Sequence, residues 1–316
     1  MKKALVTGVA GFVGSHLSEY LISQKIKVVG FFHPDHSVEN IKYIKNKLEL
    51  IPCDILDARE VEKEIARIAP DYVFHLAAFS SPPASLQIPK ETLENNIFGQ
   101  INLLDALVKI NSHAKILVVG SADEYGSVKK SDLPVGEDQP LAPGSPYAVS
   151  KVAQDLLGLQ YYLSSGLNIV RVRPSNHIGP RQSQAFVVPA FASQIAALEK
   201  QGQGTIRVGN LKSSRDFTDV RDMVRAYLLA LDRGQVGEVY NIGSGHAVKI
   251  EKILKLLLSF TKAQIKIESD RGLTRPTEVF YYDFSKFKKH TGWQPVVPLE
   301  VTLSDTINYE RSKRQS

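Results

Sequence analysis

Three side chains in the middle of the sequence have the chemistry of a proton-transfer site. Tyr147 and Lys151 are four residues apart, so on a helix they lie on one face. A tyrosine alone is a poor acid–base group near neutral pH because its reference pKa is about 10, but a neighbouring lysine favours the phenolate. With the Ser121 hydroxyl on the same oxygen, the set suits proton exchange with a hydroxyl or carbonyl group. The alternative is a helix that carries an ordinary surface tyrosine and lysine.

A glycine-rich stretch near the N-terminus is the second candidate site. Residues 4–6 have the apolar character of a buried strand, Gly8, Gly11 and Gly14 follow at three-residue spacing, and a helix follows them. The first glycine allows a tight turn, the second lets backbone approach a ligand, and the third lets the helix pack on the strand. The free N–H groups of the helix N-terminus then face an anion, most simply a pyrophosphate. An ordinary strand–turn–helix with chance glycines is the alternative.

Alternating strands and helices are expected to position these two sites. Strands are predicted at residues 27–32, 48–54, 71–78, 115–120 and 167–172, and helices at residues 58–68, 95–110 and 223–231. The alternation predicts an α/β fold of the Rossmann type, which is a doubly wound parallel sheet with ligands at the carboxyl ends of its strands. Ser121 stands directly after one of these strand ends.

The chain length of 316 residues suits one large domain and a smaller one. We expect residues 1–170 to form the NAD(P)-binding domain and residues 171–316 to form mainly a smaller C-terminal α/β substrate lobe. Residues 232–244 are expected to return to the main sheet, because residues 238–243 have a strand pattern.

The ends of the second and third strands bear on the cofactor. An acid at the end of the second strand often binds the adenine ribose and favours NAD, whereas here His33 follows the strand. We therefore expect NADP, with NAD possible, and His33 near its 2′-phosphate; a merely exposed His33 is the alternative. Asp54 is expected to bind the adenine amino group or to cap the helix of residues 58–68. Ala77 and Ala78 are small enough to let backbone lie against a flat ligand.

The composition excludes several classes of protein. There are 39 basic and 33 acidic residues, and the net charge of +6 forms no basic arm, so no nucleic-acid partner is expected. Hydrophobic residues make up 43% of the chain, which is enough for a substantial core. The single cysteine, Cys53, favours a reducing compartment, and we find neither a signal peptide nor a membrane-spanning run. The sequence predicts a cytoplasmic protein with no membrane partner and no metal site.

Several segments together resemble one enzyme class. They are residues 7–14, 75–78, 96–99, the strand end at Ser121, residues 147–151 and residues 173–176. In this combination the chain is similar to the extended short-chain dehydrogenase/reductases, which are NAD(P)-dependent enzymes of nucleotide sugars. The resemblance implies a catalytic triad of Ser121, Tyr147 and Lys151, with Tyr147 as the acid–base group and Lys151 on the nicotinamide ribose. It also implies a homodimer through the helix of Tyr147 and its neighbour. Further implied cofactor contacts are Phe12, Val13, Ile55, Leu76 and Asn96.

The loop after Ser121 bears on the reaction. Dehydratases of this class have a segment similar to Ser-Thr-Asp-Glu-x-Tyr-Gly at this position. Their Asp protonates the leaving C6 hydroxyl, and their Glu removes the C5 proton. Aligned on Tyr125, this chain has Ala122 in place of the acid and Asp123 in place of the base. A shifted alignment would use Asp123 and Glu124 as the pair, and both are expected to bind substrate; loop solvation and a cap are the alternative. A simple reductase needs only the triad and a hydride donor.

The second half of the chain resembles the GDP-sugar members of the class, in particular their 4-keto-6-deoxymannose reductases. The substrate-binding residues expected there are Asn176, Val187, Arg215, Arg275 and Glu278. Arg215 is the natural diphosphate anchor because a guanidinium binds phosphate oxygens bidentately. By the resemblance Asn176 holds the sugar or its diphosphate, Arg275 the diphosphate and Glu278 the ribose, with a plain surface carboxylate as the alternative for Glu278.

The function predicted from these segments is NAD(P)H-dependent reduction of the C4 keto group of GDP-4-keto-6-deoxy-D-mannose. A GDP-mannose 4,6-dehydratase, or another nucleotide-sugar epimerase or dehydratase, is the first alternative. A non-catalytic NADP-binding regulator that kept the fold is the second.

Overall fold

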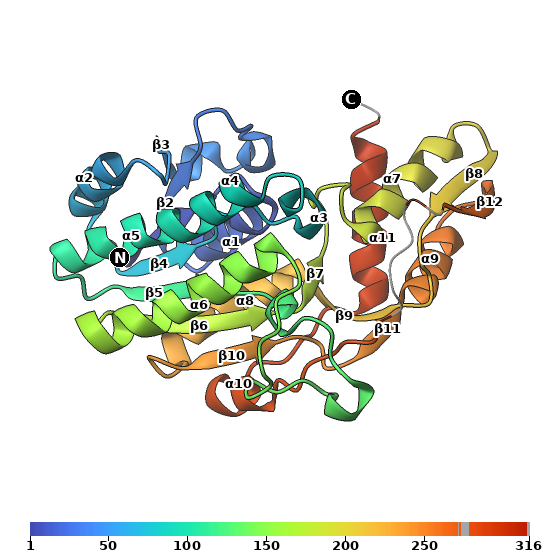
Figure 1. Cartoon of the computed structure of the whole chain (residues 1–316). Coiled ribbons are helices and arrows are strands. Elements are labelled where there is room, and N and C mark those ends of the chain that lie inside the picture. Colours follow the sequence, from blue (N-terminus) through green and yellow to red (C-terminus); the bar gives the residue numbers. More distant parts are fainter. Residues whose placement is uncertain (271, 273–277, 315–316) are drawn as a thin grey trace.

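A parallel sheet of seven strands forms the centre of the structure (Figure 1), a computed structural model that describes residues 1–270, 272 and 278–314. In sheet order the strands are β10 (Val239–Ile242), β6 (Asn168–Pro174), β5 (Lys115–Val119), β4 (Tyr72–His75), β1 (Lys3–Thr7), β2 (Lys27–Phe32) and β3 (Glu49–Pro52). All neighbouring pairs run parallel. The predicted Rossmann-type α/β fold is therefore confirmed.

Helices cover both faces of this sheet, and Figure 1 shows α5 and α6 lying across one of them. One face is covered by α1 (Phe12–Ser23), α8 (Val220–Arg233) and α10 (Ser285–Thr291), and the other by α2 (Ala58–Ile68), α5 (Gly99–Lys109) and α6 (Pro146–Ser165). In β5, Leu117 packs into the first core, whereas Ile116 and Val118 pack into the second. Burial on both faces explains why the strand is almost wholly apolar.

A second body lies beside the carboxyl ends of these strands (Figure 1). Its helices are α7 (Val187–Glu199), α9 (Ile250–Ser259) and α11 (Leu299–Ser312), and its strands are β7 (Asn176–Ile178), β8 (Gln203–Val208), β9 (Ser214–Asp219), β11 (Ala247–Lys249) and β12 (Gln264–Ser269). Its separate apolar core includes Val188, Ile253 and Leu303. From this body the chain returns to the central sheet, where Val239 of β10 pairs with Arg171 of β6. The domain division at residues 170 and 171 stays a prediction.

The order of strands creates a crevice between β1 and β4. These strands are neighbours in the sheet, but the chain continues from them to opposite sides. The Thr7 hydroxyl at the end of β1 accepts the N–H groups of Leu76 and Ala77, each at 3.1 Å, and so holds the exit of β4 beside the glycine turn. A doubly wound sheet binds its ligands at such a point. Within the described part of the chain, none of the helices has the length and apolarity needed to cross a membrane.

Candidate active site

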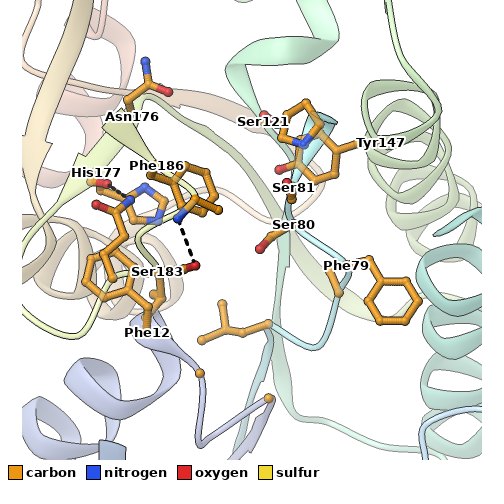
Figure 2. A pocket seen from close by; sticks show the side chains of 18 of the residues that line it. Phe12, Phe79, Ser80, Ser81, Ser121, Tyr147, Asn176, His177, Ser183 and Phe186 are labelled. Carbon is orange, nitrogen blue, oxygen red and sulfur yellow. Dashed lines mark hydrogen bonds between the residues drawn. The ribbon is translucent and has the colours of Figure 1, made fainter. Parts of the chain in front are cut away.

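A cavity of about 2140 Å³ opens at the carboxyl ends of the central strands. Its walls come from the turn after β1, the exits of β4 and β5, the start of α6, strand β7 and the start of α7. Figure 2 shows Ser121 and Tyr147 on one side, facing Asn176, His177 and Phe186 on the other. Since a pocket for one small-molecule ligand is roughly 300–1,000 Å³, the cavity has room for two ligands side by side.

The glycine turn forms a cradle in this cavity. Gly8 has a φ of 67°, and a Cβ there would come within 3.0 Å of the Ala77 nitrogen, so a larger residue would be strained. Gly11 is the N-cap of α1 and supplies no side-chain cap, which leaves the N–H groups of the first turn for a ligand. All three glycines line the cavity together with Phe12 and Val13. The cradle and the helix N-terminus fit the pyrophosphate of a dinucleotide.

The ends of β2 and β3 line the same cavity. His33, Asp54 and Ile55 all lie in its wall, and Nε2 of His33 is 3.9 Å from Oδ2 of Asp54. The alternative in which Asp54 caps α2 is wrong, because Asp57 is the N-cap and accepts the first-turn N–H bonds at 3.0 Å. The contacts of these residues with a cofactor stay predictions, as do those of the cavity residues Leu76, Ala77 and Ala78.

The start of α6 fixes Tyr147 in the cavity wall. Ser145 caps the helix by accepting the N–H of Ala148 at 3.1 Å, and Pro146 occupies the first turn. The N–H of Tyr147 itself donates to Oγ of Ser85 at 3.1 Å. The predicted acid–base residue is therefore fixed by its own backbone bond and by the cap of the next residue, and it is 8% exposed.

Burial controls the state of the Tyr147 phenol. Loss of hydration raises its pKa above the ordinary value of 10, and the negative charge of Asp123 acts in the same sense. Hydrogen bonding from the Ser121 side chain opposes this rise. The phenol is consequently protonated at neutral pH.

Lys151 lies one helical turn further along, on the predicted face. Its Nζ is 6.0 Å from the centre of the Tyr147 ring and donates to the Val119 carbonyl and to Oε1 of Gln154, each at 2.9 Å. Burial lowers the pKa of Lys151 to about 8, against the opposing charge of Glu124. Burial dominates the pKa of Tyr147, and both printed hydrogen bonds of Lys151 go to other groups. The expected effect of this lysine on the tyrosine therefore stays a prediction.

Glu124 does not lie in the cavity wall, and this corrects its predicted contact with substrate. It is 0% exposed, and Oε1 accepts the N–H of Ser121 at 2.7 Å in a reciprocal cap of the turn Ala122–Tyr125. Its Oε2 lies 3.1 Å from Nε of Arg173. Burial, reinforced by the charge of Asp155, raises the pKa of Glu124 to about 8. Only Asp123 of the two predicted carboxylates lines the cavity.

The predicted contact of Asn96 with the cofactor is also corrected by the structure. The predicted helix of residues 95–110 begins with a π-helical turn, Glu94–Phe98, in which Asn96 is fully buried and does not line the cavity. Its amide accepts the N–H of Phe79 at 2.8 Å and donates to Oγ of Ser150 at 2.9 Å. Asn96 thus joins the exit of β4 to α6, and its neighbour Asn95 is the one that lines the cavity.

The predicted substrate residues lie on the opposite wall. Asn176 on β7, Val187 at the start of α7, Arg215 on β9 and Glu278 all line the cavity. Arg215 and Glu278 form an ion pair, so the two residues assigned from separate segments meet. Arg275 lies outside the described residues.

Sequence reasoning gave no role to two residues near β7, namely His177 on the strand and Arg181 in the loop that follows it. His177 stacks on Phe12, with ring centres 5.9 Å apart and 15° between the planes. Arg181 reaches across to α1, where it donates to Glu19 at 2.7 Å and to Nδ1 of His16 at 2.8 Å. Both line the cavity and join the second body to the helix after the glycine turn. Their signal in the sequence is that residues 173–182 resemble the nucleotide-sugar loop of the class, which names the segment but not what each side chain contacts.

Comparison with known proteins places this site in a family. A family model described as GDP-mannose 4,6 dehydratase matches residues 5–306. The chain belongs to this family. GDP-6-deoxy-D-mannose reductase of Pseudomonas aeruginosa is 34% identical over 96% of the chain and 95% of that protein. The dTDP-glucose 4,6-dehydratase of an Actinoplanes species is 32% identical over 99% of the chain and 98% of that protein.

Solved structures of the same class superpose over nearly the whole chain. RMD from Pseudomonas aeruginosa, complexed with NADPH, has a TM-score of 0.86 at 32% identity and covers 99% of this chain and 100% of its own. UDP-glucose 4-epimerase from Thermotoga maritima, with UDP-glucose, has a TM-score of 0.89 at 30% identity and covers 99% of each chain. The predicted resemblance to extended short-chain dehydrogenase/reductases is confirmed. The family includes nucleotide-sugar dehydratases, reductases and epimerases, so membership leaves the reaction to be argued from the site.

Proposed function

We propose that the protein reduces the C4 keto group of GDP-4-keto-6-deoxy-D-mannose with NADPH, giving GDP-6-deoxy-D-mannose, which is GDP-D-rhamnose. The observation that carries this proposal is the burial of Glu124, which leaves Asp123 as the one carboxylate of residues 121–126 in the cavity wall. Dehydration needs an acid and a base beside the phenol, whereas keto reduction needs one proton donor. The 34% identity to a GDP-6-deoxy-D-mannose reductase supports the same choice.

The proposed roles follow from the protonation states. When bound, the nicotinamide cofactor supplies the hydride that reaches C4. Tyr147, kept protonated by its raised pKa, donates its hydroxyl proton to the oxygen on C4. The Ser121 hydroxyl hydrogen-bonds that oxygen, and the ammonium of Lys151 stabilises its developing negative charge. A neutral phenol is the protonation state that donation of a proton to the C4 oxygen requires.

We propose NADP as the cofactor, with NAD possible. The glycine cradle accommodates either, but β2 ends at Phe32 and is followed by His33 in place of an acid that would bind the ribose hydroxyls of NAD. Relatives support both choices, since RMD was solved with NADPH and UDP-glucose 4-epimerase of Thermus thermophilus with NAD.

The nucleotide sugar is proposed to lie between the triad and the second body, so that residues 1–170 bind mainly the cofactor and residues 171–316 mainly the substrate. Arg215 would hold the diphosphate, because its ion pair with Glu278 keeps the guanidinium at the cavity wall. Asn176 would hold the sugar or its diphosphate, and the start of α7 at Val187 would cover the base.

An assay with purified components tests this function. The protein with NADPH and GDP-4-keto-6-deoxy-D-mannose should oxidise NADPH and release GDP-6-deoxy-D-mannose. Parallel reactions with GDP-mannose and with UDP-glucose, without added NADPH, test the dehydratase and the epimerase. No NADPH oxidation with the keto sugar ends the reductase proposal, and conversion of either other sugar without net cofactor turnover replaces it.

We further propose that the enzyme is a cytoplasmic homodimer built through α6 and the neighbouring α5. Val149, Leu156 and Leu163 are exposed on α6 at seven-residue spacing, with 42%, 51% and 72% of their surfaces accessible. An exposed apolar stripe of this spacing is typical of a helix that packs on another helix. Cys53 is a free, buried thiol, which suits a reducing compartment.

A further inference from the structure

Tyr227 has a hydroxyl group in the protein interior without a hydrogen bond. The residue belongs to α8, its side chain is 0% exposed, and no residue of the described chain bonds its Oη. An unpaired buried hydroxyl lowers stability, so folded proteins keep few of them and each needs an explanation. A ligand that completes the hydrogen bond is such an explanation when the group stands beside a binding cavity.

The position of Tyr227 connects it with the cavity. The residue lines the cavity and belongs to the sheet core with Val9 and Val172, and not to the core of the second body. Helix α8 packs on α1, which follows the glycine turn, and on β5, which leads to Ser121. Burial raises the pKa of Tyr227, and the Tyr147 phenol acts in the same sense, an influence that requires the two phenols to be near each other. Tyr227 thus lies in the wall of the cavity, close enough to the catalytic phenol to interact with it electrostatically.

Tyr282 also has a buried hydroxyl group without a hydrogen bond to the described residues, but it lies elsewhere in the fold. It is 1% exposed, and its hydroxyl also has no hydrogen-bond partner among the described residues. Its ring packs edge-on against Tyr125 and Phe280 in a separate small cluster, and it does not line the cavity. The described residues therefore include two unpaired buried phenols, one beside the cavity and one away from it.

We propose that the Tyr227 hydroxyl binds the carboxamide group of the nicotinamide ring and so orients the ring beside Tyr147. This inference rests on the proposed function, because it takes the reactive end of the cofactor to lie next to the triad. A carboxamide offers both an N–H donor and a carbonyl acceptor, and a phenol hydroxyl pairs with either. The phosphates of the cofactor are expected at the glycine cradle, and the nucleotide sugar is expected at the wall with Asn176 and Arg215. The carboxamide is then the polar group of the cofactor that remains to be bound beside Tyr147.

The substitution Tyr227→Phe removes the hydroxyl and keeps the ring. The Kd for NADPH, measured by fluorescence titration, should rise roughly threefold to tenfold, as expected for one lost neutral hydrogen bond. Binding of 2′-phospho-ADP-ribose, which lacks the nicotinamide ring, should be unchanged. The Tm of the ligand-free variant should not fall, because the lost hydroxyl had no partner. Tyr282→Phe is the matched control, and its Kd for NADPH should equal that of the wild type.

Three results would overturn the inference. The first is an unchanged Kd for NADPH in Tyr227→Phe. The second is an equal loss for NADPH and 2′-phospho-ADP-ribose, and the third is an effect confined to the KM of the nucleotide sugar. The titrations contain no sugar, so they are independent of the reaction. Intact NADPH binding without reduction of the keto sugar would end the proposed reaction and leave the role of Tyr227 standing.

Discussion

Burial acts on Tyr147 and Lys151 in opposite senses. It raises the pKa of the phenol because the phenolate loses hydration, and it lowers the pKa of the lysine because the ammonium loses hydration. At neutral pH the pair is thus a neutral phenol next to an ammonium group. This is the combination that can give a proton to an oxygen on which negative charge develops.

Replacing the phenol tests this role directly. Tyr147→Phe should lower kcat for keto reduction roughly 10²- to 10⁴-fold, the usual range for loss of a general acid. NADPH binding should survive, because the backbone bond to Ser85 and the Ser145 cap do not involve the hydroxyl. Tyr161→Phe, at the other end of α6 and outside the cavity, is the control with wild-type rates. A Tyr147→Phe enzyme of nearly full activity would assign the proton donor to another group.

The pKa of Lys151 leads to a prediction for the pH dependence of kcat. Lys151 is charged below its pKa of about 8 and neutral above it, so kcat should fall as the pH rises through about 8. Tyr147 does not titrate in this interval, because its pKa is raised above the ordinary 10. Profiles of kcat against pH at saturating NADPH measure this fall. The Lys151→Met variant should have a lower kcat that no longer decreases as the pH rises through about 8. If kcat of the Met variant falls with pH as in the wild type, the fall does not come from Lys151.

At the scale of elements, the turn after β5 depends on a buried network of charges. Arg173 on β6 donates to Asp155 of α6 at 2.8 Å and 2.5 Å and lies 3.1 Å from Glu124 of the turn. A Cβ at Gly120 would collide with the Glu124 carboxylate, so the glycine permits this packing. One guanidinium therefore joins the turn that carries Ser121 to the helix that carries Tyr147.

Breaking this network should be costly. Arg173→Met removes one of the two cations that pair with the buried Asp155 carboxylate, since Arg171 remains 2.8 Å from it. Loss of one partner from a buried ion pair costs up to about 3–5 kcal/mol of unfolding free energy. Urea denaturation at constant pH measures it. Arg67→Met, in an ion pair on the surface of α2, should have a much smaller effect because solvent screens it. Equal losses in the two variants would show that the buried network contributes no special stability.

The sequence predicted elements better than the direction of side chains. Glycine spacing and apolar runs predicted the cradle and the sheet because those features depend on local backbone geometry. The roles of Glu124 and Asn96 were wrong because a carboxylate or amide after a strand end can face either the cavity or the core, and only the packed neighbours Arg173 and Ser150 decide which. Arg181 was missed for a related reason, since its partner Glu19 is far away in the sequence.

At the scale of the whole molecule, the cavity belongs to neither body alone. The glycine cradle and the triad come from the central sheet, whereas Asn176 and Arg215 come from the second body. The bonds of Arg181 to Glu19 and His16 connect the bodies across the cavity. Relative movement of the two bodies would therefore change cofactor and substrate contacts together.

The exposed stripe on α6 gives a prediction for the assembly. Leu156→Glu combined with Leu163→Glu puts charges on the proposed helix interface, where burying them without partners is unfavourable, so the variant should be monomeric while the wild type is dimeric. Analytical ultracentrifugation over a range of concentrations measures this, and NADPH titration checks that the site is intact. Val296→Glu, at an apolar residue that is 64% exposed away from α6, should remain dimeric. The monomer should bind NADPH, because the glycine cradle is not part of the stripe. It should have a lower Tm, because α6 loses the contact with the partner helix. A wild-type protein that is monomeric at every concentration would remove the dimer from the proposal.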